Sequence, residues 1–393
     1  SGMARSAPTF LVSSEEQHEL LDQFKRRCLH FTEAYSKHKP LCFTARAYQR
    51  SHPDKVLRGE EDADATLASP MLLGVCDGVS QVDNLGLKPS ELPQELLRSC
   101  EDIASAQLFA GTAKSSLEDA YSGPIQLLKE AYADTESHGS TSVLLAVMDN
   151  SSQVHGKLHP MIGVVTLGDC ELVILRRTDD RDACGSPLQV ILHTEKQRIG
   201  GHSQTPLQLA RLDESMYGFD EDEALEAIEQ GSGLHCMSTY EGDILILGSD
   251  GVFDNLFLSE VIEICNQKLP PRQNKETFLP AQSSVLHDIA RCIVEKALAK
   301  SEIHSDRPLA MTPLGAGGKV DDTSVVVAQV VEWTQARNDA WTRARRRRTP
   351  WGRLLAWMWP IRTTACGAIG DCGSDSDEAS DSGEEQDARE CII

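Results

Sequence analysis

The sequence has few basic residues and no long apolar run, and these two absences exclude several kinds of protein. Its 393 residues include 38 Lys and Arg against 60 Asp and Glu, which gives a formal net charge of -22. A general nucleic-acid binder needs clustered basic side chains to contact phosphates, so we expect no nucleic-acid partner. No apolar stretch reaches about 18 residues, the length that a membrane-spanning helix needs. The charge balance favours a protein that binds cations, and 40% hydrophobic residues are enough for a sizeable core.

The 12 cysteines are scattered singly, with no CxxC pair and no metal-type Cys/His spacing. This usage is typical of buried or free thiols, and it favours an intracellular, reducing compartment over a disulfide framework. We expect a cytoplasmic monomer, with a mitochondrial or membrane-peripheral location as the alternatives.

Composition divides the chain into three parts. Residues 1–40 predict a capped amphipathic helical extension. Residues 41–335 mix short apolar strand-like runs with grouped helical stretches, which favours packed sheets covered by helices over a strict βαβ alternation. Within this part, residues 213–233 predict an acidic helical insertion that forms a solvated surface flap. Residues 336–393 combine an Arg- and Trp-rich segment with an acidic, serine-rich tail that is typical of disorder.

The Arg- and Trp-rich segment over 337–362 has two interpretations. Trp prefers the membrane interface and Arg is attracted to anionic lipid, so peripheral membrane contact is one of them. The other is intramolecular, with the basic block paired to the acidic tail or the Trp side chains covering part of the domain. The sequence leaves both open.

Several aspartates stand at the ends of apolar runs. Asp77 follows LLGVC, Asp169 follows VVTLG, Asp250 follows ILILGS, and Asp321 with Asp322 precedes TSVVVAQVV. Carboxylates are hard oxygen ligands suited to Mg²⁺ or Mn²⁺, and buried carboxylates that converge need a compensating positive charge. A pair of divalent ions lowers the pKa of a shared water and directs it at phosphorus. The pattern therefore predicts a metal-dependent phosphoester hydrolase.

Six motifs in a fixed order resemble the metal-dependent Ser/Thr protein phosphatases of type 2C. They are GEEDAD (59–64), GVCDGVS (74–80), HGSTSVLLAV (138–147), TLGDCELVILR (166–176), EGDILILGSDGVFDNL (241–256) and GGKVDDTSVVVAQV (317–330). Stretches such as HPDKVLRGEEDA and GGKVDD are similar to the subgroup with mitochondrial and chloroplast members. The resemblance implies an α+β fold, a four-layer α-β-β-α sandwich with two central, mostly antiparallel sheets.

The resemblance also implies which residues hold the metal pair, Mn²⁺ or Mg²⁺. Asp77 is expected to bridge the two ions, and the Gly78 carbonyl to help at one of them. Asp250 and Asp321 are expected to hold one ion together. Asp322 is expected not to bind an ion directly but to support the metal ligands or to stabilise a turn.

Further acids complete the implied metal site. Glu61 is expected to order waters on the other ion, supported by Asp62. Asp169 and Asp254, together with Asp250, match a pocket for a third, weaker ion. For Asp254 the alternative is an acid that the dipole of the following helix stabilises.

Three positions depart from the family pattern. Val79 stands where many members have a His thought to protonate the leaving group, although the similar subgroup also has Val there. Ser80 and Gln81 replace a Gly-Gly step. Arg58 is the candidate phosphate-binding arginine because its guanidinium fork matches phosphate, and it lies one place closer to the acidic pair than in the best-known members.

The sequence therefore predicts an enzyme that hydrolyses phosphoserine and phosphothreonine in phosphoprotein substrates. A water that bridges the two ions would attack phosphorus in line, with Asp77, Asp250 and Arg58 as catalytic residues. The alternative is a catalytically inactive scaffold of the same fold that binds a partner through its insertion or tail. The intact set of acids favours the enzyme.

Overall fold

The computed structural model describes residues 39–80, 82, 86–108, 121–154, 157–177, 187–199, 205–213, 220–270, 278–302 and 308–348. The chain divides into two compact units, residues 1–333 and 334–393. The predicted helical extension lies outside the described residues except for its last two positions. The acidic tail and the segment beyond residue 348 lie outside them as well.

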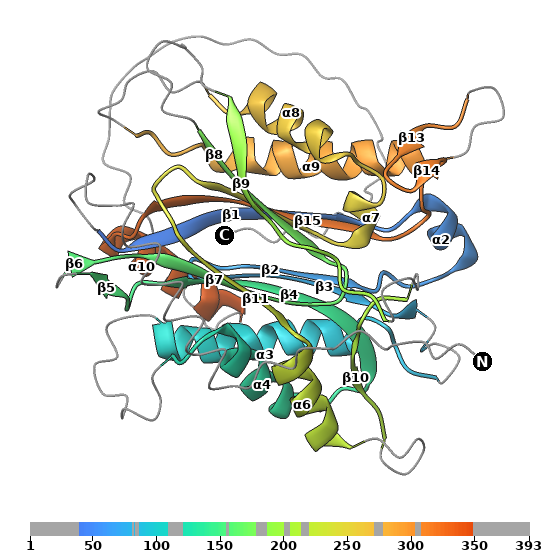
Figure 1. The fold of residues 1–393 in the computed structure, drawn as a ribbon, viewed down its shortest axis with the longest axis horizontal. Coiled ribbons are helices and arrows are strands. Elements are labelled where there is room, and N and C mark those ends of the chain that lie inside the picture. The colour runs from blue at the N-terminus through green and yellow to red at the C-terminus, as the bar shows by residue number, and fades with distance from the viewer. Residues whose placement is uncertain are drawn as a thin grey trace, which may run out of the picture. The chain divides into compact units, whose positions relative to one another are not determined.

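Two antiparallel sheets form the centre of the first unit (Figure 1). One has the order β1-β15-β12-β8-β9 and comprises β1 (Leu41–Arg50), β15 (Thr323–Glu332), β12 (Ile244–Gly248), β8 (Glu171–Arg177) and β9 (Leu188–His193). The other has the order β11-β7-β4-β3-β2, with β10 also paired to β4. It comprises β11 (Gly233–Ser238), β7 (Met161–Leu167), β4 (Gly139–Asp149), β3 (Leu72–Gly78), β2 (Asp64–Ala68) and β10 (Leu209–Arg211). Two small hairpins lie apart, β5 (Gln153–Val154) with β6 (Lys157–Leu158) and β13 (Met311–Thr312) with β14 (Gly315–Ala316).

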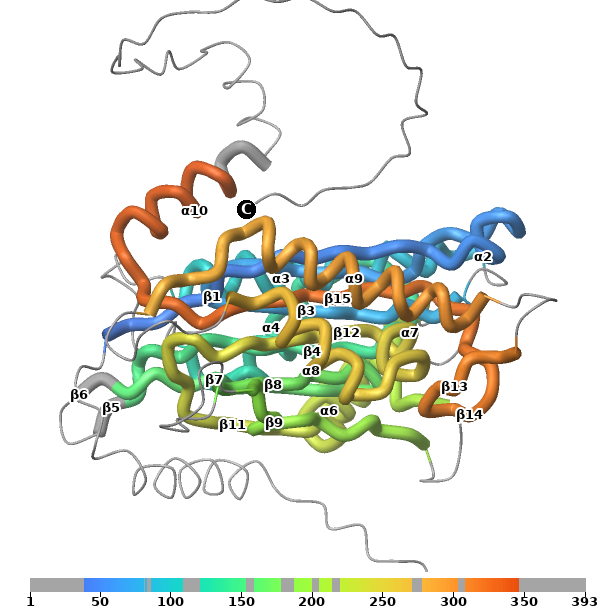
Figure 2. The backbone as a smooth tube through the Cα atoms, turned by 90° about the horizontal axis from the view of Figure 1, so that it is seen from above, coloured from blue at the N-terminus to red at the C-terminus, as the bar shows by residue number. Residues whose placement is uncertain are grey.

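Helices cover the outer face of each sheet, which gives four layers (Figure 1). On the first sheet lie α8 (Leu258–Lys268) and α9 (Ser283–Ser301), and α9 runs along β1 and β15 (Figure 2). On the second sheet lie α3 (Glu91–Leu108), α4 (Pro124–Ala133) and α6 (Glu221–Gly231). The short helices are α2 (Pro53–Arg58) and α7 (Asp250–Phe253). The predicted α-β-β-α sandwich is confirmed.

The alternation of side chains along the strands builds this core. In β3, Leu73 and Val75 are buried between the two sheets, whereas Leu72 and Cys76 are buried under the helices of the second layer. Successive side chains of a strand point to opposite faces, so a strand that is buried on both faces is apolar throughout. The next residue on the inner face of β3 is Asp77, at the end of the strand. The space between the sheets therefore ends in a carboxylate.

Of the acidic insertion over 213–233, the structure describes residue 213 and residues 220–233. Its helix α6 buries Ala224 and Ile228 in the same core cluster as α3 and α4. Lys129 on α4 also pairs with Glu229 on α6, with 2.7 Å between nitrogen and oxygen. The described part of the insertion belongs to the helical layer, so the interpretation of these residues as a solvated flap is wrong. Ala224 and Ile228 are four residues apart and share one helix face, and this apolar pair is outnumbered by the surrounding acids.

The second unit contributes α10 (Gln335–Arg348) to the described residues. Among the described parts of the chain, no helix is both long and apolar enough to cross a membrane. The described cysteines are free thiols, and all but Cys292 are buried.

Candidate metal centre

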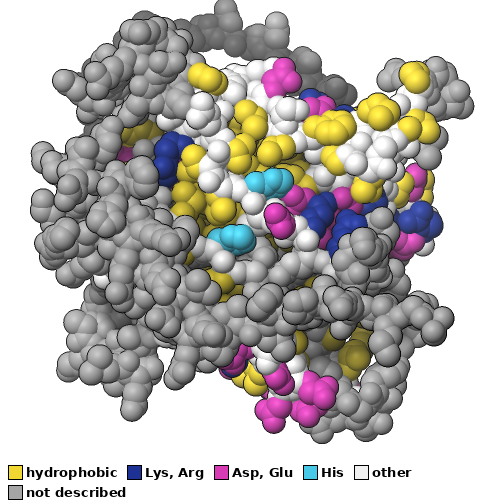
Figure 3. All heavy atoms as spheres, in the orientation of Figure 1, with side chains coloured by type: hydrophobic (Ala, Val, Ile, Leu, Met, Phe, Trp, Pro, Cys, Tyr) yellow, Lys and Arg dark blue, Asp and Glu magenta, His cyan; other side chains and the backbone are white. Residues whose placement is uncertain are grey.

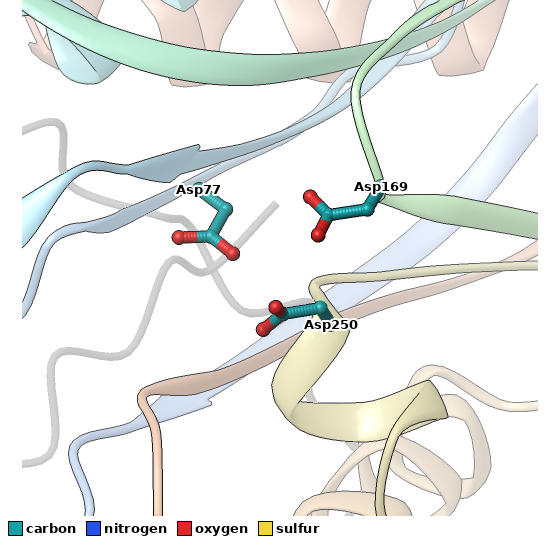
Figure 4. A group of neighbouring side chains, drawn as sticks. All are labelled: Asp77, Asp169 and Asp250. Carbon is teal, nitrogen blue, oxygen red and sulfur yellow. The ribbon is translucent and has the colours of Figure 1, made fainter. Parts of the chain in front are cut away.

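Three aspartates converge at one end of the two sheets (Figure 4). Asp77 is the next-to-last residue of β3, Asp169 lies in the turn between β7 and β8, and Asp250 begins α7 with one residue between it and the end of β12. One carboxylate oxygen from each lies within 4.8 Å of the other two. The structure thus brings together three of the residues predicted as metal ligands, from segments far apart along the chain.

Close backbone packing places Asp250. The amide of Ser249 donates a hydrogen bond of 3.1 Å to the carbonyl of Ser324, which ties the end of β12 to the start of β15. Immediately afterwards Gly251 lies so close to β15 that an added Cβ would stand 2.0 Å from the Asp322 carbonyl oxygen. Only glycine fits there, so the Asp-Gly pair aims α7 and its first carboxylate at the cluster.

Burial and mutual repulsion raise the pKa of these three carboxyl groups. Burial, with the negative charge of Asp250, raises the pKa of Asp77 well above its ordinary value. The same two causes raise the pKa of Asp169 to about 6. Burial also raises the pKa of Asp250, although Lys319 opposes the effect. Three acids that resist ionisation together form a site that a cation would stabilise.

Two lysines that the sequence analysis did not single out neutralise part of this charge. Lys319 pairs with Asp250 Oδ2 and, at 2.7 Å, with Asp321 Oδ2. Lys55 from α2 donates to Asp322 Oδ2 at 2.7 Å and to Asp321 Oδ1 at 3.1 Å. Burial alone would raise the pKa of Asp321, but the two ammonium groups hold it below its usual value. On the face of the molecule drawn in Figure 3, basic side chains are gathered beside acidic ones.

A third lysine holds Asp254. Lys196 pairs with Asp254 Oδ1 and, at 3.1 Å, with Glu171 Oε1, and His193 Nε2 lies 2.6 Å from the other oxygen of Glu171. Asp254 is buried, and its amide donates to the Asp250 carbonyl inside the first turn of α7. The predicted third-ion ligand is therefore held in an ion pair within the protein.

The predicted ligand Gly78 is the last residue of β3, and three further predicted residues lie on α2 and the segment after it. Glu61 is exposed. Asp62 accepts a hydrogen bond of 3.1 Å from the Asp64 amide, and burial together with the charge of Asp322 raises its pKa. Arg58 is exposed, and its Nη2 donates to Glu60 Oε2 at 3.2 Å, so its guanidinium fork is bound to a neighbouring carboxylate. None of these three belongs to the described three-carboxylate cluster.

Asp64 is an acid of the site that the sequence analysis missed. It lies directly opposite Asp77 in the β2–β3 pair, so the two side chains share the inner face of the sheet. Burial, followed by the charges of Asp62 and Asp322, raises its pKa well above the ordinary value. Its Oδ2 has no hydrogen-bond partner among the described residues. The last residue of the GEEDAD motif is Asp64, which is also the first residue of β2. An acid at the start of a strand was the signal that could have identified it.

The cluster fits a divalent cation. Its donors are three carboxylates, the hard oxygen ligands that Mg²⁺ and Mn²⁺ prefer. Asp250 Oδ1 is buried and has no hydrogen-bond partner among the described residues. A buried, unsatisfied carboxylate oxygen is costly unless it binds a proton or a metal ion.

The relatives found by comparison with known proteins have consistent names, because each one described here is called a protein phosphatase. No family model matches the chain. It is 27% identical over 284 residues to probable protein phosphatase 2C 26 of Arabidopsis thaliana, which covers 71% of this chain and 81% of that protein. It is also 24% identical over 299 residues to the protein phosphatase PTC7 homolog fig of Drosophila grimshawi, covering 72% of this chain and 85% of that protein.

A further curated relative is covered over a smaller share of its length, whereas two solved structures are covered almost completely. Probable protein phosphatase 2C 62 of Arabidopsis thaliana is 27% identical over 282 residues, which are 71% of this chain and 32% of the relative. Among solved structures, the photosystem II phosphatase PBCP matches with a TM-score of 0.49 and 22% identity, covering 74% of this chain and all of that one. The catalytic domain of the phosphatase PstP, in complex with two manganese ions, matches with a TM-score of 0.44 and 17% identity, covering 74% and 99%.

Proposed function

We infer from these sequence relationships that this chain, a member of the type 2C family of metal-dependent Ser/Thr protein phosphatases, hydrolyses phosphoserine and phosphothreonine in proteins. The observation that carries this function is the convergence of Asp77, Asp169 and Asp250 within 4.8 Å. Three converging carboxylates that can hold divalent ions suit a hydrolase in which water attacks the phosphorus.

We propose that two ions, Mn²⁺ or Mg²⁺, are bound here. When bound, they would lower the pKa of a coordinated water enough for it to attack phosphorus near neutral pH. Asp77, Asp169 and Asp250 would hold them, and Asp321 is the further carboxylate, joined to Asp250 through Lys319. A third, weaker ion at Asp169, Asp250 and Asp254 stays part of the proposal, and it would compete with the ammonium group of Lys196 for Asp254.

The substrate phosphate would meet positive side chains of the protein as well. Arg58 remains the predicted phosphate contact, and the side chain of Arg58 is 55% exposed. Its partner Glu60 is also solvent-accessible, and ion pairs in water are weak, so a dianionic phosphate can replace that carboxylate at little cost. A bidentate contact of this kind would orient the phosphoryl group.

The phosphoprotein substrate, a monomeric state and peripheral membrane contact through 337–362 are parts of the same proposal. So is a reducing intracellular compartment, which the free thiols of the described cysteines support. The inactive scaffold remains the alternative function, and a single assay separates the two.

The assay measures phosphate release from a phosphoserine peptide with Mn²⁺, with EDTA, and after Asp250→Ala. We expect turnover with Mn²⁺ and none with EDTA. Asp250→Ala should lower kcat/KM by more than about 100-fold, since even residues behind metal ligands contribute about 10- to 100-fold. Asp288→Ala on the exposed face of α9 is the matched control and should retain activity. Turnover that is absent, or that persists in EDTA, would favour the scaffold.

A further inference from the structure

Lys319 has a fixed backbone and a side chain with room to move. Its amide donates to Asn255 Oδ1 at 2.8 Å, and its carbonyl accepts from Asn255 Nδ2 at 3.0 Å. Asn255 is fully buried, so this double contact anchors the loop between β14 and β15. The Lys319 side chain is nevertheless 35% exposed. A long side chain on an anchored backbone can exchange one position of its ammonium group for another.

The ammonium group of Lys319 lies between two predicted ligands of one ion. It contacts Asp250 Oδ2 and Asp321 Oδ2, which flank the same end of the β12–β15 pair, one after β12 and one before β15. A divalent cation that used both carboxylates would need the space and the lone pairs that the ammonium group takes. An ammonium group and a divalent ion that both contact these two carboxylates would also repel each other strongly, because both are positively charged. A divalent ion bound through these two Oδ2 atoms would therefore displace the ammonium group.

Lys55 is a useful contrast within the same site. Its side chain is only 6% exposed, and its ammonium group donates to Asp321, Asp322 and, at 3.4 Å, to Ser80 Oγ. Lys55 contacts Asp321 through Oδ1 and Asp322 through Oδ2, and among the described residues it forms no hydrogen bond with the three carboxylates of the cluster. Because its side chain is almost completely buried, we expect Lys55 to remain a counter-ion of the site with and without metal.

We propose that Lys319 is a displaceable internal cation, which occupies the position between Asp250 and Asp321 without metal and is released when a divalent ion binds. The proposal rests on the metal-dependent function proposed above, but it concerns metal binding and not turnover. Lys319 lowers the affinity for the metal and stabilises the metal-free protein. The protein thereby keeps its acidic site folded when metal is scarce.

The first test measures Mn²⁺ binding by calorimetry and thermal unfolding in EDTA for Lys319→Met. This variant keeps an unbranched side chain and removes the charge. We expect Mn²⁺ to bind about tenfold more tightly or better, because one charge-assisted hydrogen bond corresponds to roughly that factor. The melting temperature in EDTA should fall. Lys319→Arg should restore both values toward the parent, and Lys129→Met, which breaks the ion pair between α4 and α6, should leave the Mn²⁺ affinity unchanged.

The second test uses the unaltered protein and does not depend on a variant that folds. Surface amines are acetylated briefly with and without saturating Mn²⁺, and each lysine is quantified by mass spectrometry. We expect labelling of Lys319 to rise several-fold with Mn²⁺, while Lys55 stays unlabelled in both states. Labelling of Lys319 that stays constant or falls, or a Lys319→Met affinity within twofold of the parent, would overturn the proposal. Absent phosphatase activity with these shifts intact would count against the proposed function alone.

Discussion

Replacing Asp77 by Asn should change the stability of this protein in opposite directions with and without metal. The substitution keeps the shape of the side chain and removes one of three charges whose oxygens lie within 4.8 Å of one another. Without metal, the loss of charge relieves repulsion at a buried site. With metal, it removes a ligand.

The size of the first effect follows from the geometry. At 4.8 Å and an effective dielectric constant of about 20, two full charges repel by about 3.5 kcal/mol. Burial and this repulsion raise the pKa of Asp77 and Asp169, so part of the repulsion is already relieved by bound protons. A gain of about 1–3 kcal/mol at neutral pH is the expected remainder. For a domain of this size, this raises the melting temperature by roughly 2–8 °C.

Thermal unfolding in EDTA and in saturating Mn²⁺ measures both effects on the same samples. We expect Asp77→Asn to melt above the parent in EDTA and below it in Mn²⁺, because the parent gains stability from the ion and the variant does not. Asp288→Asn, an exposed acid on α9, is the control and should change neither value appreciably. The reasoning is refuted if Asp77→Asn melts below the parent in EDTA, or if Mn²⁺ stabilises the variant as much as the parent.

Two further predictions follow from the same site. Because the pKa of Asp169 is raised to about 6, the metal-free protein holds a proton there below that pH, and Mn²⁺ must displace it. Calorimetry should therefore show the Mn²⁺ affinity falling by up to about tenfold per pH unit below pH 6, and equal dissociation constants at pH 5 and pH 7 would contradict this assignment. Gly78→Ala should lower the free energy of unfolding by about 2–4 kcal/mol, because its Cβ would meet the Pro89 and Ala63 carbonyl oxygens at 2.4 and 2.6 Å. Urea denaturation checks it against Gly163→Ala, whose Cβ has nothing nearer than 3.4 Å, and equal losses in the two variants would show that the close approach at Gly78 is not what matters.

Much of the fold could be predicted because its signals are local. The runs MLLGVC, MIGVVTL, DILILG and TSVVVAQVV all became strands buried on both faces, and the helical stretches between them became the outer layers. The insertion helix α6 was misjudged because its two buried residues are few beside its acids. Whether a helix face meets a core depends on what lies next to it, and that is not a local property.

The predicted site divides in the same way. Asp77, Asp169 and Asp250 were identified from their positions after apolar strands, and the structure brings them together. Arg58 and Glu61 were chosen by their place in a motif, and the structure puts both on the exposed segment around α2. Whether these two act in the reaction stays a prediction.

By itself, the sequence determined which segments are strands and that carboxylates stand at their ends, because alternation and burial are properties of a few consecutive residues. Tertiary structure alone decided which charges meet. Lys55, Lys196 and Lys319 each neutralise acids that lie 58 to 267 positions away in their longest pairings. Asp64 faces Asp77 through the register of two strands. Ion pairs between distant residues depend on how the sheets pack, and no local pattern specifies that packing.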